Sequence, residues 1–192
     1  MDIFIVGLYS YFLGSIPFGL IYAKLAGLGD VRNIGSGNIG ATNVLRTGNK
    51  KVAALTLLSD IAKGSLAVFI TFNFFPKLIL LSSVVVYLGH IFPVWLKFKG
   101  GKGVATFIGA IAILNYVLCF IFLISWAIVA KIFKISSLSA IVAFLITFVA
   151  TVFLYENNLI VVMSFFTVFS IFTHRENIKK IISGEESKIK TK

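Results

Sequence analysis

The chain has 192 residues, of which 58% are hydrophobic and 13% charged, and its mean hydropathy is +1.00. Apolar runs of about twenty residues recur along its whole length, which excludes an ordinary soluble domain and indicates an all-α polytopic membrane protein. The net charge of +11 does not indicate a nucleic-acid partner, because basic loops beside membrane spans explain it. The single cysteine, Cys119, excludes a disulfide framework and a cysteine-ligated metal site.

The first predicted span runs from about Ile3 to Ala23. No Lys or Arg precedes it, so we expect a retained helix rather than a signal peptide. Pro17 lies inside this span, and a proline removes a backbone hydrogen bond from a helix. We therefore expect a kink at Pro17. The polar, glycine-rich stretch that follows, between Lys24 and Lys51, should be cytoplasmic because several Lys and Arg residues gather there.

The apolar run 103–130 decides how many times the chain crosses the membrane. A single crossing would leave Lys131 and Lys134 on the outer side, whereas two short crossings that turn near Asn115 return both lysines to the cytoplasm. The bias of positive charge toward the cytoplasm favours two crossings. The other predicted spans are 52–75, 78–96, 136–155 and 159–173, with an outer turn at 156–158.

The resulting topology has seven transmembrane helices, some of them short, with the N-terminus outside and the C-terminus in the cytoplasm. Sixteen of the 18 Lys and Arg residues then lie on the cytoplasmic side. Of the other two, Lys63 lies within a span and Lys77 lies outside. Two crossings in roughly thirty residues must be short, tilted or sheltered, since a full crossing takes ~20. A five-span alternative with a re-entrant hairpin keeps the same sidedness. We expect residues 1–192 to form a single membrane-embedded domain.

Three polar segments are predicted to meet on the cytoplasmic side, and the first is 35–46. It contains the pattern G-x-G-x-x-G, but no strand precedes it, so a dinucleotide site is not indicated. A glycine-rich loop that enters a helix still presents N–H groups to a phosphate, and Thr42 and Arg46 would share a helix face beside them. As an alternative, Asn38 or Thr42 is a plain helix cap.

The second segment is 89–106, and its part from Leu96 to Thr106 places three lysines and three glycines between two apolar runs. Glycines allow several N–H groups to converge and lysines add positive charge, which favours phosphate binding, and a helix expected from Val104 would add its N-terminus. A basic turn at the lipid headgroups explains the same charges. This is not a Walker A motif, because Gly103 follows Lys102 where that motif has Ser or Thr.

The third segment, 174–185, contains His174, which can accept a proton or a hydrogen bond at pH 7, with Asn177 on the same helical face. Its lysines and Arg175 are expected to meet anionic lipid headgroups. Asp60 and Lys63 lie in the second span and can pair with each other. Ionisable residues in membrane helices are commonly functional, although structural pairing explains these two equally well.

These segments, together with Gly14–Gly19 and Asp60–Gly64, resemble the membrane-integral acyl-phosphate:glycerol-3-phosphate acyltransferases (the PlsY family), in the same order over nearly the whole chain. The resemblance implies a bacterial inner-membrane enzyme of phospholipid synthesis. It would transfer a fatty acyl group from acyl phosphate to the 1-hydroxyl of glycerol 3-phosphate, forming lysophosphatidic acid and phosphate. The implied partners are these two substrates and membrane lipid, with no cofactor, metal or nucleic acid.

The resemblance also implies the site. The catalytic residues would be Ser36, Arg46, Lys102, His174 and Asn177. Further substrate-binding residues would be Gly35, Gly37, Asn38, Thr42, Asn43, Lys63, His90, Gly100, Gly101, Gly103, Thr106 and Glu185. Because acyl phosphate is already activated, the hydroxyl can attack it directly, without an acyl-enzyme. The protein then has to position the reactants and stabilise developing charge.

Our hypothesis assigns acyl phosphate to Ser36, Asn38, Lys102 and the N–H groups of Gly101 to Gly103. It assigns glycerol 3-phosphate to Thr42, Asn43, Arg46, His174 and Asn177. Either His174 or the donor's own phosphate would accept the hydroxyl proton. The alternative functions are transport of a phosphorylated solute and a scaffold that binds lipid headgroups. The sequence shows no inverted repeat, and this absence argues against a transporter.

Overall fold

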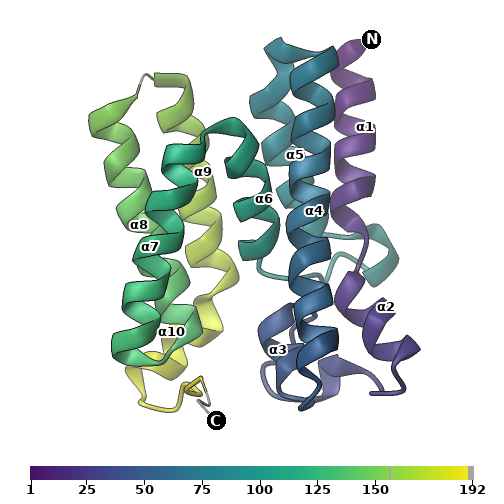
Figure 1. Cartoon of the computed structure of the whole chain (residues 1–192), viewed down its shortest axis with the longest axis vertical. Helices are drawn as coiled ribbons and strands as arrows, with labels where there is room; N and C mark the ends of the chain where they lie inside the picture. The colour runs from purple at the N-terminus through teal and green to yellow at the C-terminus, as the bar shows by residue number, and fades with distance from the viewer. Residues whose placement is uncertain (156, 190–192) are drawn as a thin grey trace. The chain divides into compact units, whose positions relative to one another are not determined.

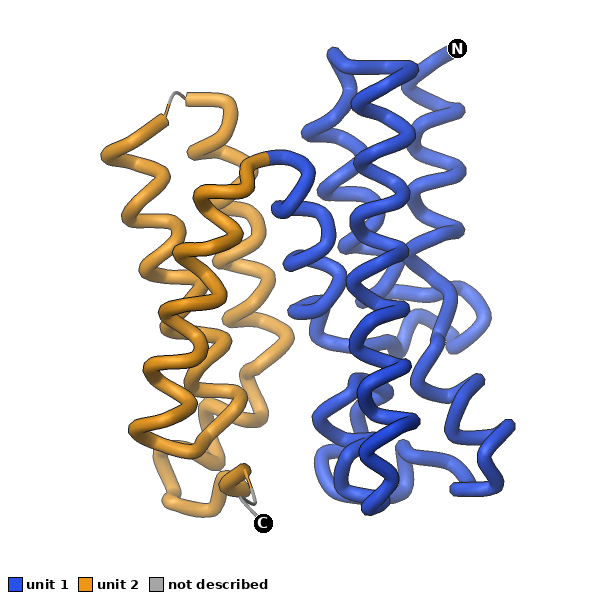
Figure 2. Tube along the Cα trace, viewed as in Figure 1, with its two compact units in different colours: residues 1–114 blue, residues 115–192 orange. Residues whose placement is uncertain are grey.

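The computed structural model describes residues 1–155 and 157–189, and these residues form helices joined by short loops (Figure 1). They divide into two compact units, Met1–Leu114 and Asn115–Lys192, coloured blue and orange in Figure 2. We describe each unit by itself.

Unit 1 contains α1 (Asp2–Ser15), α2 (Phe18–Leu25), α3 (Ala41–Leu45), α4 (Lys50–Phe74), α5 (Ile79–Ile91) and α6 (Val104–Leu114). Short 3₁₀ helices cover Val31–Asn33, Pro76–Leu78 and Val94–Leu96. The long helices α1, α4 and α5 lie side by side, and α3 lies near the beginning of α4 (Figure 1). An apolar cluster of Ala23, Val31, Val44, Val52 and Ala53 fixes α2 and α3 against α4.

The predicted kink in the first span is confirmed as a full break. Helix α1 ends at Ser15 and α2 begins at Phe18, with Ile16 extended between them. The cause is Pro17, which has no N–H to donate and restricts the residue before it to an extended conformation.

Close helix crossings in unit 1 depend on glycine. A Cβ at Gly14 of α1 would overlap the carbonyl oxygen of Val86 in α5. A Cβ at Gly109 of α6 would likewise overlap the carbonyl oxygen of Ile61 in α4. Small residues let membrane helices approach at backbone distance, where van der Waals contact stabilises the bundle.

Unit 2 contains α7 (Tyr116–Phe133), α8 (Ser136–Leu154), α9 (Asn157–Thr173) and α10 (Arg175–Ile182). Phe122 of α7 and Phe144 of α8 meet edge to face, with ring centroids 5.0 Å apart. The predicted break near Asn115 is confirmed, because the Asn115 side chain caps α7 by accepting from the N–H of Leu118 at 3.0 Å. Of the predicted outer turn, residue 156 lies outside the described residues, and Asn157 already begins α9.

Among the described residues, five segments are long and apolar enough to cross a membrane: Asp2–Leu25, Lys50–Phe74, Pro76–Leu96, Tyr116–Phe133 and Ser136–Leu154. Helices α9 and α10, bent by 60°, make a sixth if they count as one span. Helix α6 has 11 residues and is short, as expected, at about half the ~30 Å of a hydrocarbon core. The chain is thus a multi-pass membrane protein, while a seventh crossing through α6 and the sidedness remain predictions.

Candidate active site

The first glycine-rich segment is held together by the side-chain amide of Asn43. Its Nδ2 donates to the carbonyls of Val31 (2.6 Å) and Asn38 (2.8 Å). Its Oδ1 accepts from the N–H of Ser36 (3.0 Å) and from Arg46 Nη1 (3.3 Å). Both donors and both acceptor positions of this buried amide are therefore used within the chain. The structure gives Asn43 the role of holding the loop, where the sequence suggested a substrate contact.

Three polar residues near Asn43 are exposed, while Val44 beside it is buried. Gly35 and Gly37 have φ values of +54° and +68°, which glycine adopts without strain. Arg46 lies over Gly35, where an added Cβ would come within 2.5 Å of Arg46 Cδ. The side chains of Ser36, Thr42 and Arg46 are exposed, so a hydroxyl pair and a guanidinium are presented from one short stretch.

A bidentate ion pair anchors the beginning of the same loop. Arg32 donates through Nε and Nη2 to the two carboxylate oxygens of Asp30, at 2.9 Å and 2.6 Å. The hydrogen bond from the Arg32 side chain lowers the pKa of Asp30 to about 2. Arg32 is therefore occupied by Asp30. Arg46, which donates to Asn43 Oδ1, stays the arginine that the sequence predicts to bind phosphate.

The second segment is folded by backbone hydrogen bonds at the end of α5. The N–H of Gly100 donates to the carbonyl of Ile91 (2.9 Å), and the N–H of Gly101 donates to the carbonyl of His90 (3.0 Å). These two amides are engaged within the chain, which corrects the expectation that the Gly101 N–H binds phosphate. The prediction of anion binding here then rests on Lys102, Gly103 and the first turn of α6, because the first amides of a helix lack intrahelical acceptors.

Two further residues predicted to bind substrate, Thr106 and His90, lie buried in unit 1. Thr106 is 0% exposed, and its carbonyl oxygen lies where a Cβ on Gly64 would be, so it belongs to the contact of α6 with α4. His90 is buried, and a Cβ added at Gly101 would overlap its ring. Both residues face other parts of unit 1, where the sequence suggested substrate contacts.

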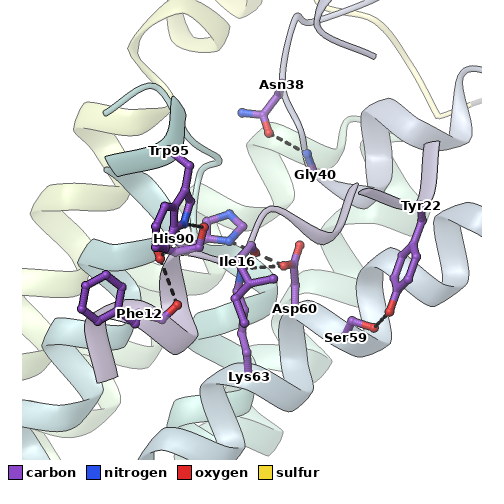
Figure 3. A network of polar contacts seen from close by, with 11 residues as sticks. Phe12, Ile16, Tyr22, Asn38, Gly40, Ser59, Asp60, Lys63, His90 and Trp95 are labelled. Carbon is purple, nitrogen blue, oxygen red and sulfur yellow. Dashed lines mark hydrogen bonds and ion pairs between the residues drawn. The ribbon is translucent and has the colours of Figure 1, made fainter. Parts of the chain in front are cut away.

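Asp60 and Lys63, one turn apart on α4, form a buried ion pair with Nζ and Oδ1 2.7 Å apart (Figure 3). Lys63 also donates to the carbonyl oxygen of Ile16 at 2.8 Å. The pairing allowed by their spacing is therefore present. The ammonium has partners inside unit 1, where the sequence suggested that Lys63 contacts substrate.

The third segment belongs to unit 2 and begins with a buried histidine. His174 Nδ1 lies 2.8 Å from the carbonyl oxygen of Ser170. A carbonyl only accepts hydrogen bonds, so Nδ1 carries the proton and Nε2 of the neutral ring carries the lone pair. This tautomer suits a group that accepts a proton or a hydrogen bond from a hydroxyl.

Asn177 is held by Glu186, which the sequence analysis missed. Asn177 Nδ2 donates to Glu186 Oε1 at 2.7 Å, and the hydroxyl of Ser137 donates to the same oxygen at 2.7 Å. The predicted substrate-binding residue Glu185 is exposed. Glu185 and Glu186 are adjacent in the sequence, so the sequence alone does not show which of them contacts Asn177. The hydrogen bonds in the structure identify Glu186.

The structure therefore assembles the first two segments on unit 1 and the third on unit 2. The two segments of unit 1 are glycine-rich and basic, and the segment of unit 2 contributes a histidine of defined tautomer. Groups that hold anions predominate, and His174 is a candidate proton acceptor. The convergence of all three segments stays a prediction from the sequence.

Known proteins share this organisation. Residues 4–184 match the family model for glycerol-3-phosphate acyltransferase. A glycerol-3-phosphate acyltransferase of Mesorhizobium japonicum is 48% identical over 184 residues, covering 96% of this chain and 94% of that protein. One of Pelagibacter ubique is 48% identical over 192 residues, covering 99% of each.

Two solved structures of PlsY, an integral membrane glycerol 3-phosphate acyltransferase, are also similar. Its glycerol 3-phosphate form has a TM-score of 0.93 and 33% identity, covering 100% of this chain and 97% of that chain. Its lysophosphatidic acid form has a TM-score of 0.87 and 31% identity, covering 98% and 95%. The resemblance expected from the motifs is confirmed, and the chain belongs to the glycerol-3-phosphate acyltransferase (PlsY) family of integral membrane enzymes.

Proposed function

We propose that this enzyme transfers a fatty acyl group from acyl phosphate to the 1-hydroxyl of glycerol 3-phosphate. The observation that carries the proposal is the similarity, over its whole length, to the glycerol 3-phosphate form of PlsY. The lysophosphatidic acid form of the same protein supports acyl transfer to that acceptor. The products are lysophosphatidic acid and inorganic phosphate.

The choice of acyl phosphate as donor rests on the two glycine-rich basic segments of unit 1. One segment would suffice for glycerol 3-phosphate alone, whereas a phosphorylated donor needs a second. In our assignment Lys102 and the first turn of α6 hold the donor phosphate together with Ser36 and Asn38. Arg46 and Thr42 hold the phosphate of glycerol 3-phosphate, because a planar guanidinium binds phosphate in a bidentate manner.

The reaction we propose is a direct attack. The hydroxyl oxygen of glycerol 3-phosphate forms a bond to the acyl carbon, the bond from that carbon to the phosphate oxygen breaks, and phosphate leaves with the electron pair. Nε2 of His174 accepts the hydroxyl proton, and Asn177 orients the acceptor. The donor phosphate is the other group able to take this proton. Lys102 and Arg46 stabilise the charge that develops on the oxyanion and the leaving phosphate.

We further propose that the enzyme lies in the bacterial inner membrane as a single domain, with its three polar segments on the cytoplasmic side. Charge placement supports this sidedness, since nearly all Lys and Arg residues then fall in the cytoplasm. Its relatives in Mesorhizobium and Pelagibacter support a bacterial membrane.

The test is turnover by the purified full-length protein in detergent micelles. With acyl phosphate and glycerol 3-phosphate we expect release of phosphate together with lysophosphatidic acid, identified by mass spectrometry. An acyl thioester offered in place of acyl phosphate is expected to give no product. Activity with the thioester alone would overturn the choice of donor. Absence of any product would instead favour a transport or scaffold function, because micelles offer no membrane to transport across.

A further inference from the structure

The buried pair of Asp60 and Lys63 takes no part in the chemistry proposed above. Each residue is 3% exposed, and both lie within the span Lys50–Phe74. Charged groups in a membrane helix are costly, and a buried ion pair contributes little net stability. The contacts that this pair makes with the rest of unit 1 indicate what it does instead.

The first contact is with the break in the first span. Two carbonyl oxygens there, of Ser15 and Ile16, lie where the regular helix stops. Lys63 Nζ donates to the Ile16 carbonyl at 2.8 Å. Trp95 Nε1 donates to Ser15, at 3.0 Å to its carbonyl and 2.8 Å to its hydroxyl (Figure 3). The break is thus held from α4 on one side and, on the other, from the turn Val94–Leu96, which precedes the glycines of the second segment.

The second contact leads directly to that segment. His90 Nδ1 lies 3.7 Å from Asp60 Oδ1, so the imidazole stands beside the ion pair (Figure 3). The carbonyl of His90 accepts from the N–H of Gly101, and its ring fills the space where a Gly101 side chain would be. His90 therefore connects the surroundings of Asp60 to the backbone just before Lys102.

The third contact leads to the first segment. Helix α2 begins directly after the break, and a Cβ at Gly19 would overlap the carbonyl oxygen of Ile39. On the same helix, Tyr22 shares a hydrogen bond of 2.8 Å with Ser59 of α4. Helix α2 begins two residues after the carbonyl bound by Lys63, and its position sets the position of the loop around Asn38.

We propose that Asp60, Lys63 and Trp95 are positioning residues that set both anion-binding segments of unit 1 at once. Lys63 and Trp95 fix the break from which α2 carries the first segment. Asp60 keeps the Lys63 ammonium in place and supports His90 beneath the second segment. None of the three touches substrate. This inference rests on the proposed function only in that the two segments bind phosphoryl groups.

The sharpest test is Trp95→Phe, which removes the indole N–H and keeps an aromatic ring beside Phe12, whose centroid lies 5.6 Å from that of Trp95. We expect the KM for both substrates to rise roughly tenfold, because loosened positioning weakens the binding of each phosphate, with a smaller change in kcat. Trp126→Phe, in α7 of unit 2, is the matched control and should leave both KM values unchanged.

A second variant, Asp60→Asn with Lys63→Met, removes the bond to Ile16 without leaving a buried charge unpaired. We expect the same rise in both KM values. When this double variant is combined with Trp95→Phe, the rise in KM should be smaller than the product of the two separate rises, because both changes act on the same break in the first span. The control is Ser10→Ala with Ser82→Ala, which removes another buried hydrogen bond, of 2.9 Å, from the contact of α1 with α5.

The outcomes separate positioning from simple stabilisation. A lower Vmax with both KM values unchanged would show that the network only keeps the protein folded, and would overturn the proposal. A rise in KM for only one substrate would also overturn the proposal, since the same three residues are proposed to position both segments. Calorimetric binding of inorganic phosphate extends the test to a protein without turnover. If the wild type does not use acyl phosphate, the proposed function fails, whereas weaker phosphate binding by Trp95→Phe still supports the network.

Discussion

His174 Nδ1 donates to the carbonyl oxygen of Ser170 at 2.8 Å, which leaves the lone pair of the neutral imidazole on Nε2. Ser170 lies in the last turn of α9 and His174 directly follows that helix, so the end of α9 orients the ring. The tautomer is thereby set before any substrate arrives.

His174→Gln tests whether this ring is the base. Glutamine keeps hydrogen bonding but cannot take up a proton, so we expect kcat to fall roughly a hundredfold, the usual contribution of general base catalysis. Steady-state kinetics of His174→Gln and His174→Ala should show similar losses. If His174→Gln kept most of the wild-type kcat, the donor phosphate would be the base.

Arg46→Lys tests the phosphate clamp. A lysine keeps the charge but loses the planar pair of donors, so we expect the KM for glycerol 3-phosphate to rise at least about tenfold. Arg32→Lys is the matched control in the same loop, since Asp30 already occupies Arg32. Equal KM values for wild type and Arg46→Lys would show that Arg46 is wrongly assigned.

Asn43→Ala tests the assignment of Asn43 to loop structure. The change leaves the carbonyls of Val31 and Asn38 and the N–H of Ser36 without their partner, which should cost about 2–3 kcal/mol of stability. Thermal unfolding in detergent, at one fixed scan rate, should show a lower Tm. Thr42→Ala, at an exposed neighbour, should leave Tm unchanged. A binding role for Asn43 would give the reverse pattern, with normal Tm and weaker binding of glycerol 3-phosphate.

Glu186→Gln and Glu185→Gln form a matched pair. Glu186 accepts hydrogen bonds from Asn177 and Ser137, and loss of its charge weakens both, so we expect kcat to fall roughly tenfold as Asn177 loosens. Glu185 is exposed, so Glu185→Gln should behave as wild type. If Glu185→Gln lost activity and Glu186→Gln did not, the result would support the substrate contact that the sequence predicts for Glu185.

Local chemistry made much of the fold predictable. Pro17 predicted the break in the first span, and the polar Asn115 inside a long apolar run predicted the boundary between α6 and α7. Both signals act through a single residue and its own backbone. The positions of the two glycine-rich segments could be read for the same reason, because glycine and lysine are rare inside apolar runs.

Side-chain partners could not be predicted in this way. The sequence does not reveal that the Asn43 amide is saturated by Val31, Asn38, Ser36 and Arg46, because those bonds depend on how the loop closes. It also cannot separate Glu185 from Glu186, or show that the Gly101 amide is bound by His90. In each case a polar group that the sequence offers for binding is used within the chain to build the segment itself.

The central claim is direct transfer from acyl phosphate to glycerol 3-phosphate. The most direct measurement is a single turnover with enzyme in excess, followed by mass spectrometry of both the intact protein and the lipid product. Direct attack predicts one lysophosphatidic acid for each phosphate released, with no change in protein mass at any time. A protein species heavier by one acyl group, formed before the product appears, would contradict it.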